Sequence, residues 1–207
     1  IGYADRLNQL PLSTIGVAIS TVLLPLLAKQ VRKGELEAAQ HSQNLAIEFS
    51  LALTMPAFMG LIFLAPMLVE TIFHHGEFKS SDVLPTAHTL IAFASGLPAY
   101  VLLKVVSTNF FAHGDTKNPM IAAAICLTLN VILNLILMRP FAHVGISAAT
   151  AISSWINLFI LMTILKRKRF FTFNALFLKS LGRIAILSSI FMILLYFGKD
   201  PVANILR

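Results

Sequence analysis

Long apolar runs constrain this chain more than any other feature of its sequence. Six of them are bounded by charged or turn-forming residues: Leu10–Ala28, Phe49–Val69, Thr89–Ala112, Pro119–Met138, Val144–Leu165 and Ile184–Gly198. The first five are 19 to 24 residues long, which as helices is enough to cross a hydrocarbon layer about 30 Å thick. The sixth is shorter, and the flanking Lys179 and Arg183 extend it because long basic side chains reach toward the interface.

The sequence therefore predicts an all-α fold, a polytopic transmembrane helical bundle of about six spans, because lipid cannot satisfy an open backbone. Only 12% of the residues are charged, about half of what a soluble domain carries. Cys126 is the single cysteine, so neither a disulfide within the chain nor a cysteine-based metal site is expected. Because the chain begins with Ile1, we expect an internal or C-terminal piece of a longer protein.

The basic residues predict the orientation of the spans. Ten of them follow the first, third and fifth runs: Lys29, Arg32, Lys33, Lys117, Lys166, Arg167, Lys168, Arg169, Lys179 and Arg183. The positive-inside rule places these in the cytoplasm, with the connections 29–43, 114–118 and 166–180. The segments 70–85 and 140–143 are then on the opposite side. The net charge of +7 does not indicate nucleic acid, because the run 166–169 directly follows a span and is expected at anionic lipid headgroups.

Polar residues form a stripe on the first span. Arg6, Gln9, Ser13, Gly16 and Ser20 are spaced by three or four residues, which puts them on one helical face. Two interpretations stay open: the stripe lines a cavity, or Arg6 reaches the headgroups while the small residues allow close packing. Within the third span, Lys104 requires a partner or a cavity unless it reaches the interface.

A second pair of stripes lies on the fourth and fifth spans. Asn130 and Asn134 are one turn apart, and the fifth span has a polar face made of Ser147, Thr150, Ser154 and Asn157. The two asparagines, the Thr150 hydroxyl and the Ile146 carbonyl are candidate ligands for a monovalent cation such as sodium. The alternative is hydrogen bonding between the helices. Two neutral amides make a poor cation site without a carboxylate, which would have to come from outside this chain.

No catalytic signature supports an enzyme, and no further cofactor is predicted. His74 and His75 are adjacent but have no third ligand at a suitable spacing. The sequence contains no nucleophile elbow, P-loop or dinucleotide fingerprint.

Four segments carry a resemblance that covers the chain in order: YADRLNQLPLSTIGVAISTVLLPLLAKQ, FHHGEFKSSD, FFAHGDTKNPM and HVGISAATAISSWINL. They resemble the MurJ (MviN) flippases of the multidrug/oligosaccharidyl-lipid/polysaccharide exporter superfamily. The first and third are the most specific, because they place charged and turn residues at set positions.

The resemblance implies a fourteen-helix, two-lobe transporter of the bacterial cytoplasmic (inner) membrane. Such a protein moves lipid II, the lipid-linked peptidoglycan precursor, to the periplasmic leaflet by alternating access. Residues 1–165 correspond to most of the second lobe, with five helices, and 166–207 to a basic cytoplasmic linker and the first extra C-terminal helix. The N-terminal lobe is missing and would be a partner within the same protein, alongside membrane lipids.

The resemblance also assigns a substrate contact. The arginine of the ADR motif corresponds to Arg6, which is expected to contact the diphosphate of lipid II, with Gln9 and Ser13 as further members of the cavity stripe. A guanidinium suits this role because it binds phosphate oxygens in a bidentate manner.

Three alternatives to a lipid II flippase agree less well with the sequence. A drug/cation antiporter or a polysaccharide-lipid flippase of the same superfamily is not expected to keep the ADR and GDTKNP segments together. An integral-membrane enzyme of lipid-linked sugar metabolism requires an acidic or histidine cluster at a membrane face, which the sequence lacks. A scaffold without transport has no need of Arg6 and Lys104 within apolar helices.

Overall fold

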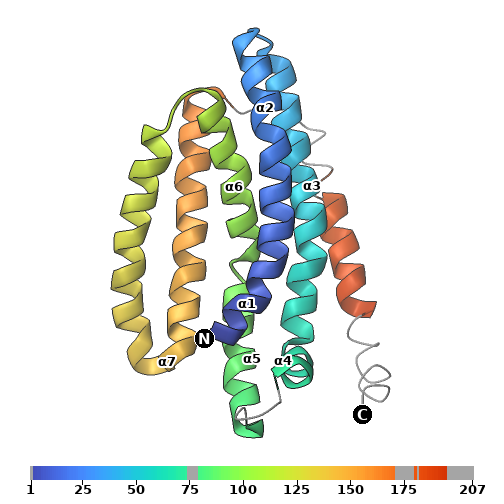
Figure 1. Ribbon diagram of the computed structural model, residues 1–207, viewed down its shortest axis with the longest axis vertical. Coiled ribbons are helices and arrows are strands. Elements are labelled where there is room, and N and C mark those ends of the chain that lie inside the picture. The colour runs from blue at the N-terminus through green and yellow to red at the C-terminus, as the bar shows by residue number, and fades with distance from the viewer. Residues whose placement is uncertain (1, 74–78, 171–179, 181, 195–207) are drawn as a thin grey trace.

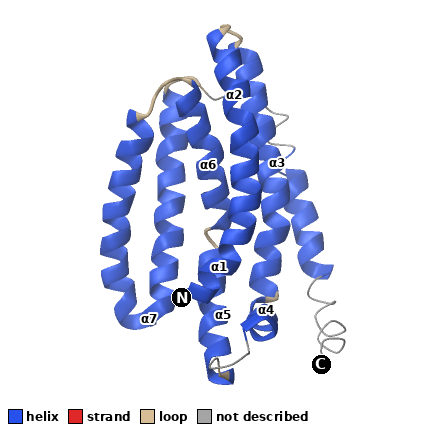
Figure 2. Cartoon of the chain, in the orientation of Figure 1, coloured by secondary structure: helices blue, strands red, loops and turns tan. Residues whose placement is uncertain are grey.

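The regular elements of the structure are all helical. The computed structural model describes residues 2–73, 79–170, 180 and 182–194, and within them Figure 2 shows only helices joined by loops. In chain order they are α1 (Gly2–Pro11), the π-helix η1 (Leu12–Val17), α2 (Ala18–Arg32), α3 (Leu36–Phe63), α4 (Ala65–Phe73), α5 (Ser80–Ala94), α6 (Leu97–Ala112) and α7 (Lys117–Arg167). A short apolar helix, Gly182–Leu194, follows. The predicted all-α fold is confirmed.

Among the described residues, four helical stretches are long and apolar enough to cross a membrane: Gly2–Arg32, Leu36–Phe63, Ser80–Ala112 and Lys117–Arg167. The last of these folds back on itself and therefore supplies two passes (Figure 1). The helix Gly182–Leu194 covers most of the predicted sixth run, and residues 195–198 of that run lie outside the described residues.

The first pass contains a π-helical segment next to Pro11. Proline has no N–H to donate and its ring crowds the preceding turn, which disturbs the regular hydrogen-bond ladder. Two hydroxyls after it bond back to carbonyl oxygens: Ser13 Oγ donates to Gln9 O and Thr14 Oγ1 to Leu10 O, both at 2.8 Å. These bonds satisfy backbone acceptors at a place where lipid offers no donor.

The third pass is broken inside the predicted run Thr89–Ala112. Between α5 and α6, the backbone turns at Ser95 and Gly96, and Pro98 lies in the first turn of the next helix. The freed carbonyl of Ser95 accepts a hydrogen bond at 3.0 Å from Trp155 Nε1 on α7. A Cβ at Gly96 would be 2.9 Å from the Cα of Ala151, so glycine allows α7 to approach the break closely.

Helix α7 is a hairpin of two arms. The bend is at Ala142, which has a φ of 47° and a ψ of −124°, and Figure 1 shows the arms in yellow and orange, side by side. A Cβ at Gly145 would overlap the carbonyl of Leu137, so the arms meet at a position that requires glycine. The two arms contain the predicted fourth and fifth spans, with the turn at the predicted residues 140–143.

The connections are grouped at the two ends of the bundle as predicted. The α2–α3 and α6–α7 connections and the end of α7 lie at one end, which we call the basic end because it carries Lys29, Arg32, Lys33, Lys117, Lys166 and Arg167. The end of α4, the beginning of α5 and the bend of α7 lie at the other end (Figure 1).

Two connections are shorter than predicted. Helix α3 already begins at Leu36, and α4 and α5 cover residues up to Phe73 and from Ser80. The polar start of α3 is helical because the bundle provides hydrogen-bond partners for its side chains. Gln43 is fully buried, and its Nε2 donates to the Val105 carbonyl at 3.2 Å. The predicted connections 29–43 and 70–85 therefore include helical residues, because the helices continue beyond the apolar runs.

Two apolar clusters hold the helices together. One joins α2, α3, α6 and α7 around Leu27, Phe110 and Leu161, and the other joins α1, α4, α5 and α6 around Val69 and Leu90. The outer face of the first α7 arm is apolar and exposed, including Ile125, Leu127, Val131, Leu135 and Ile136. Apolar exposure on this scale is typical of a surface that faces lipid or another part of a membrane protein.

Candidate functional site

Two adjoining hollows lie along the face that the first pass shares with α6. The larger, of about 710 Å³, is between α2, α6 and both arms of α7, and the smaller, of about 330 Å³, is between α1, η1, α5, α6 and α7. Val17 and Lys104 line both. Polar side chains of the larger hollow are Ser20, Thr21, Ser107, Thr108, Thr116 and Asn157, and those of the smaller are Asp5, Asn8, Gln9, Ser13, Tyr100 and Thr150.

The hollows are at different depths in the bundle. Thr116 and Pro119, which line the larger one, belong to the α6–α7 connection and the first turn of α7, so this hollow opens toward the basic end. Asp5 and Gln9, which line the smaller one, belong to α1 near the opposite end. Lys104 therefore stands where two regions of different depth meet.

Lys104 is the only cation that lines either hollow in the part of the chain that the structure describes. A Cβ at Gly16 would be 2.9 Å from Lys104 Cδ, so the stem of the lysine crosses the first pass at a notch that glycine leaves open. The side chain is exposed and forms no ion pair with a described residue. Its charge is therefore available to an anion entering the hollows.

Only part of the polar stripe predicted on the first pass lines the two hollows. Gln9 and Ser13 line the smaller hollow and Ser20 the larger, whereas Gly16 is buried against α6. Arg6 is exposed, lines neither hollow and has no hydrogen bond or ion pair with another described residue. Its predicted role in substrate binding stays a prediction.

Sequence reasoning missed Asp5 as a member of the lining. Its Oδ2 accepts a hydrogen bond from Gln9 Nε2 at 2.6 Å, and both residues line the smaller hollow. The signal was present in the four-residue spacing of Asp5, Gln9 and Ser13, which places them above one another on a helix. The smaller hollow thus has an acidic group facing the same space as Lys104.

The candidate cation ligands come together across the α7 hairpin. Asn134 Nδ2 donates to Asn130 Oδ1 at 3.0 Å, Asn130 Nδ2 lies 3.5 Å from Thr150 Oγ1, and that hydroxyl donates to the Ile146 carbonyl at 3.0 Å. The Oδ1 atom of Asn134 is buried and has no hydrogen-bond partner. One oxygen is therefore left over for a ligand, while the others already bond to one another.

The groups of this set carry no charge. All four groups are neutral, and no cluster of three or more histidine, cysteine or acidic residues occurs among the described residues. As they stand, the contacts join the two arms by hydrogen bonds. Cation binding stays a prediction that depends on a carboxylate from outside the chain.

Comparison with known proteins identifies the family. Residues 1–204 match the family model described as "Lipid II flippase MurJ". The chain belongs to the MurJ family. A probable lipid II flippase MurJ of Rhizobium meliloti is 37% identical over 97% of this chain and 38% of its own length. For the MurJ relative of Rickettsia prowazekii, the identity is 40% over 76% of this chain and 31% of its own length.

A solved structure agrees with the MurJ fold. The chain superposes on a lipid II flippase MurJ in an inward closed conformation with a TM-score of 0.74 and 30% sequence identity, over 97% of this chain and 47% of that one. The predicted family and the multi-pass helical architecture are thereby confirmed. The chain spans less than half the length of these MurJ proteins.

Proposed function

We propose that this chain is part of a lipid II flippase, which moves the precursor from the cytoplasmic to the periplasmic leaflet of the bacterial inner membrane by alternating access. The observation that carries the proposal is the pair of hollows joined at Lys104, on a chain of the MurJ family. Flippases are transporters, so the proposal involves no enzymatic step. In this proposal, residues 1–165 form most of the second lobe, and the N-terminal lobe covers the hollowed face.

The lining suits an amphiphilic anion. A diphosphate is attracted to the Lys104 ammonium, which acts as a point charge in a site drier than bulk water. Around it, the hydroxyl oxygens of Ser20, Thr21 and Ser107 and the amide of Asn157 can accept hydrogen bonds from sugar hydroxyls, and the Ser20 and Thr21 protons are donated to backbone carbonyls. The remaining wall of the larger hollow is apolar, including Leu24, Leu103 and Phe111, and it suits a lipid chain.

Two cations at different depths give a direction to the proposed path. The larger hollow opens toward the basic end, which the positive-inside rule assigns to the cytoplasm. A substrate entering there meets Lys104 first. Arg6 is on α1, nearer the other end of the same pass. In the proposed cycle, Arg6 then holds the diphosphate after closure of the lobes has brought it to face the cavity.

The proposal is tested with the full-length protein in cells depleted of their own lipid II flippase. We expect it to restore growth and the appearance of lipid II at the outer leaflet. Failure of both, with the protein at a normal level in the membrane, would exclude this substrate. Export of a drug or of another polysaccharide lipid in the same cells would then support a different transporter of the superfamily.

A further inference from the structure

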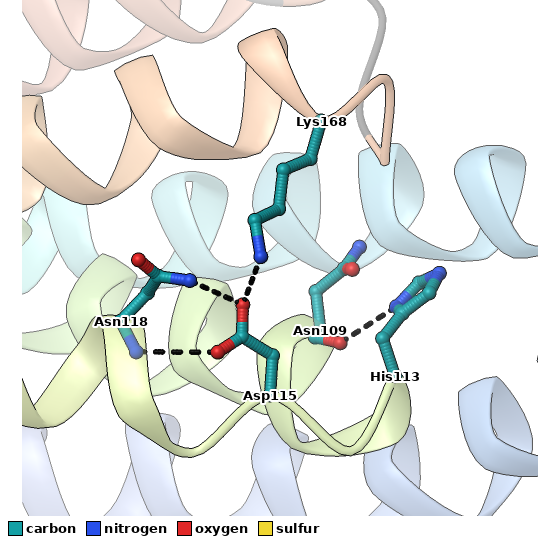
Figure 3. A network of polar contacts seen from close by, with 5 residues as sticks. All are labelled: Asn109, His113, Asp115, Asn118 and Lys168. Atoms are coloured by element: carbon teal, nitrogen blue, oxygen red, sulfur yellow. Dashed lines mark hydrogen bonds and ion pairs between the residues drawn. The ribbon is translucent and has the colours of Figure 1, made fainter.

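The α6–α7 connection contains a network of contacts that the hollows do not use. Its sequence, HGDTKN at residues 113–118, is part of the third segment that resembles the MurJ proteins. Figure 3 shows how its side chains lie against Lys168, the residue that ends the second arm of α7. The two partners are 53 residues apart in the sequence.

Asp115 is the centre of this network. Its Oδ2 accepts hydrogen bonds from Lys168 Nζ and from Asn118 Nδ2, both at 2.6 Å, and its Oδ1 accepts one from the Asn118 backbone N–H at 3.2 Å (Figure 3). The Asp115 side chain is only 12% exposed. Burial by itself would raise the pKa of this carboxyl, but the bonds from Lys168 and Asn118 outweigh it and lower the pKa to about 2. The Asp115 carboxylate is therefore ionised at neutral pH.

The ion pair joins the beginning of α7 to its end. Asp115 precedes the first turn and bonds a backbone N–H there, where a negative charge is favourable. Lys168 is the C-cap residue of the second arm, where a positive charge is favourable. Both charges are thus stabilised by their own helix ends as well as by each other.

The chain leaves α7 through a turn that supports this contact. Arg169 N donates to Lys166 O and Phe170 N to Leu165 O, both at 3.1 Å, which is the bond pattern of a Schellman motif. Arg169 has a φ of 59° in the position where glycine is usual. Hydrogen bonds fix the peptide groups on both sides of this residue. The Arg169 N–H is bonded to Lys166 O, and the Arg169 carbonyl accepts a hydrogen bond from Gln40 Nε2 at 3.2 Å.

An aromatic contact adds a second attachment. The ring of Phe170 stacks on that of His113, with centroids 3.8 Å apart and planes 13° from parallel. His113 is itself held by its Nδ1, which donates to the Asn109 carbonyl at 2.9 Å (Figure 3). The connection is therefore attached to the exit of α7 by one ionic and one aromatic contact.

We propose that Asp115 and Lys168, supported by His113 and Phe170, form a latch that positions the rim of the larger hollow. Thr116 and Pro119 line that hollow and flank the Asp115–Asn118 contacts, so a released connection would displace this wall. Asp115 and Lys168 are positioning residues, because neither lines the hollow. The functional part of this inference rests on the proposed transport of lipid II, whereas the latch itself does not.

The test uses the full-length protein with Asp115→Asn, Lys168→Met, both changes together, and Lys168→Arg. Lys117→Met is the matched control, because Lys117 begins α7 two residues after Asp115 and forms no ion pair with a described residue. The thermal midpoint of the purified protein and flipping in depleted cells are both measured. We expect each single change to lower the midpoint by the same amount and to reduce flipping about fivefold or more. A loss of this size is in the range of interaction energies between contacting residues.

The double variant should be no worse than either single variant, and Lys168→Arg and Lys117→Met should resemble the wild type. Additive losses, or equal loss in Lys168→Arg and Lys168→Met, would overturn the latch. Coupled midpoints with unchanged flipping would overturn its role at the rim. Absence of flipping in the wild type would contradict the proposed function instead, and the midpoints would still decide whether the latch exists.

Discussion

At the scale of single residues, the position of each charge separates three roles. Lys104 lines both hollows, Lys168 forms an ion pair with Asp115, and Arg6 is exposed on α1 outside both hollows. Of the run 166–169, expected at lipid headgroups, Lys168 thus has a partner within the protein. Charge count alone does not distinguish these roles, because they depend on what each side chain faces.

Lys104→Ala should reduce flipping in the full-length protein while leaving its membrane level unchanged. The loss of one charge-assisted contact corresponds to about 1.5–3 kcal/mol, or about 10- to 150-fold in affinity. Lys104→Arg should keep part of the activity, although its larger head must fit beside Gly16. Complementation of depleted cells measures the activity of each variant, and a blot of the membrane fraction measures its level. Wild-type growth with Lys104→Ala would show that this lysine has no part in the substrate path.

Arg6→Ala is expected to abolish flipping without preventing membrane insertion, because the first pass is apolar enough without it. Arg6→Lys should restore activity only partly, since an ammonium keeps the charge but not the planar fork. The same complementation assay applies. Normal growth at wild-type protein levels would mean that Arg6 only anchors a helix end, and absence of the variant from the membrane would mean a structural role.

At the scale of the helices, glycines determine where two backbones meet. Gly145→Ala should destabilise the protein by about 1–3 kcal/mol, because its Cβ would overlap the Leu137 carbonyl across the α7 hairpin. Gly60→Ala is the matched control: it lies in α3 with nothing within 4 Å and should be neutral or stabilising. Thermal unfolding of the purified full-length variants compares them. Equal midpoints would contradict the close approach of the arms.

The hydrogen-bond chain across that hairpin separates the two interpretations of its asparagines. If a monovalent cation binds there, Asn134→Leu should remove any dependence of transport on sodium as well as lower activity. If the groups only join the arms, the same change should cost about 0.6 kcal/mol of stability and leave the ion dependence as it was. Flipping assays with sodium replaced by potassium or choline provide the measurement.

At the scale of the whole molecule, the basic end and the opposite end make the topology testable. In a cysteine-free full-length background, Ser81→Cys should react with a membrane-impermeant maleimide in intact spheroplasts. Lys117→Cys should react only after the membrane is opened, because the positive-inside rule places the basic end in the cytoplasm. Labelling of Ser81→Cys from the cytoplasmic side alone would show that the orientation is the reverse of the predicted one.

The sequence by itself determined the class, the five long apolar passes, the grouping of the connections and the family. Run length sets whether a helix can span a membrane, and charge next to a span is a local property of the chain. Local periodicity also found Asn130, Asn134 and Thr150, which the structure brings together.

Only the tertiary structure decided which polar groups face a common space. The break at Ser95–Gly96 depends on Trp155 from another helix, and the helical start of α3 depends on burial of Gln43 against α6. The ion pair of Asp115 with Lys168 spans 53 residues. Periodicity describes a residue's face on its own helix and not the helix opposite, so contacts of this kind become visible only when the bundle is packed.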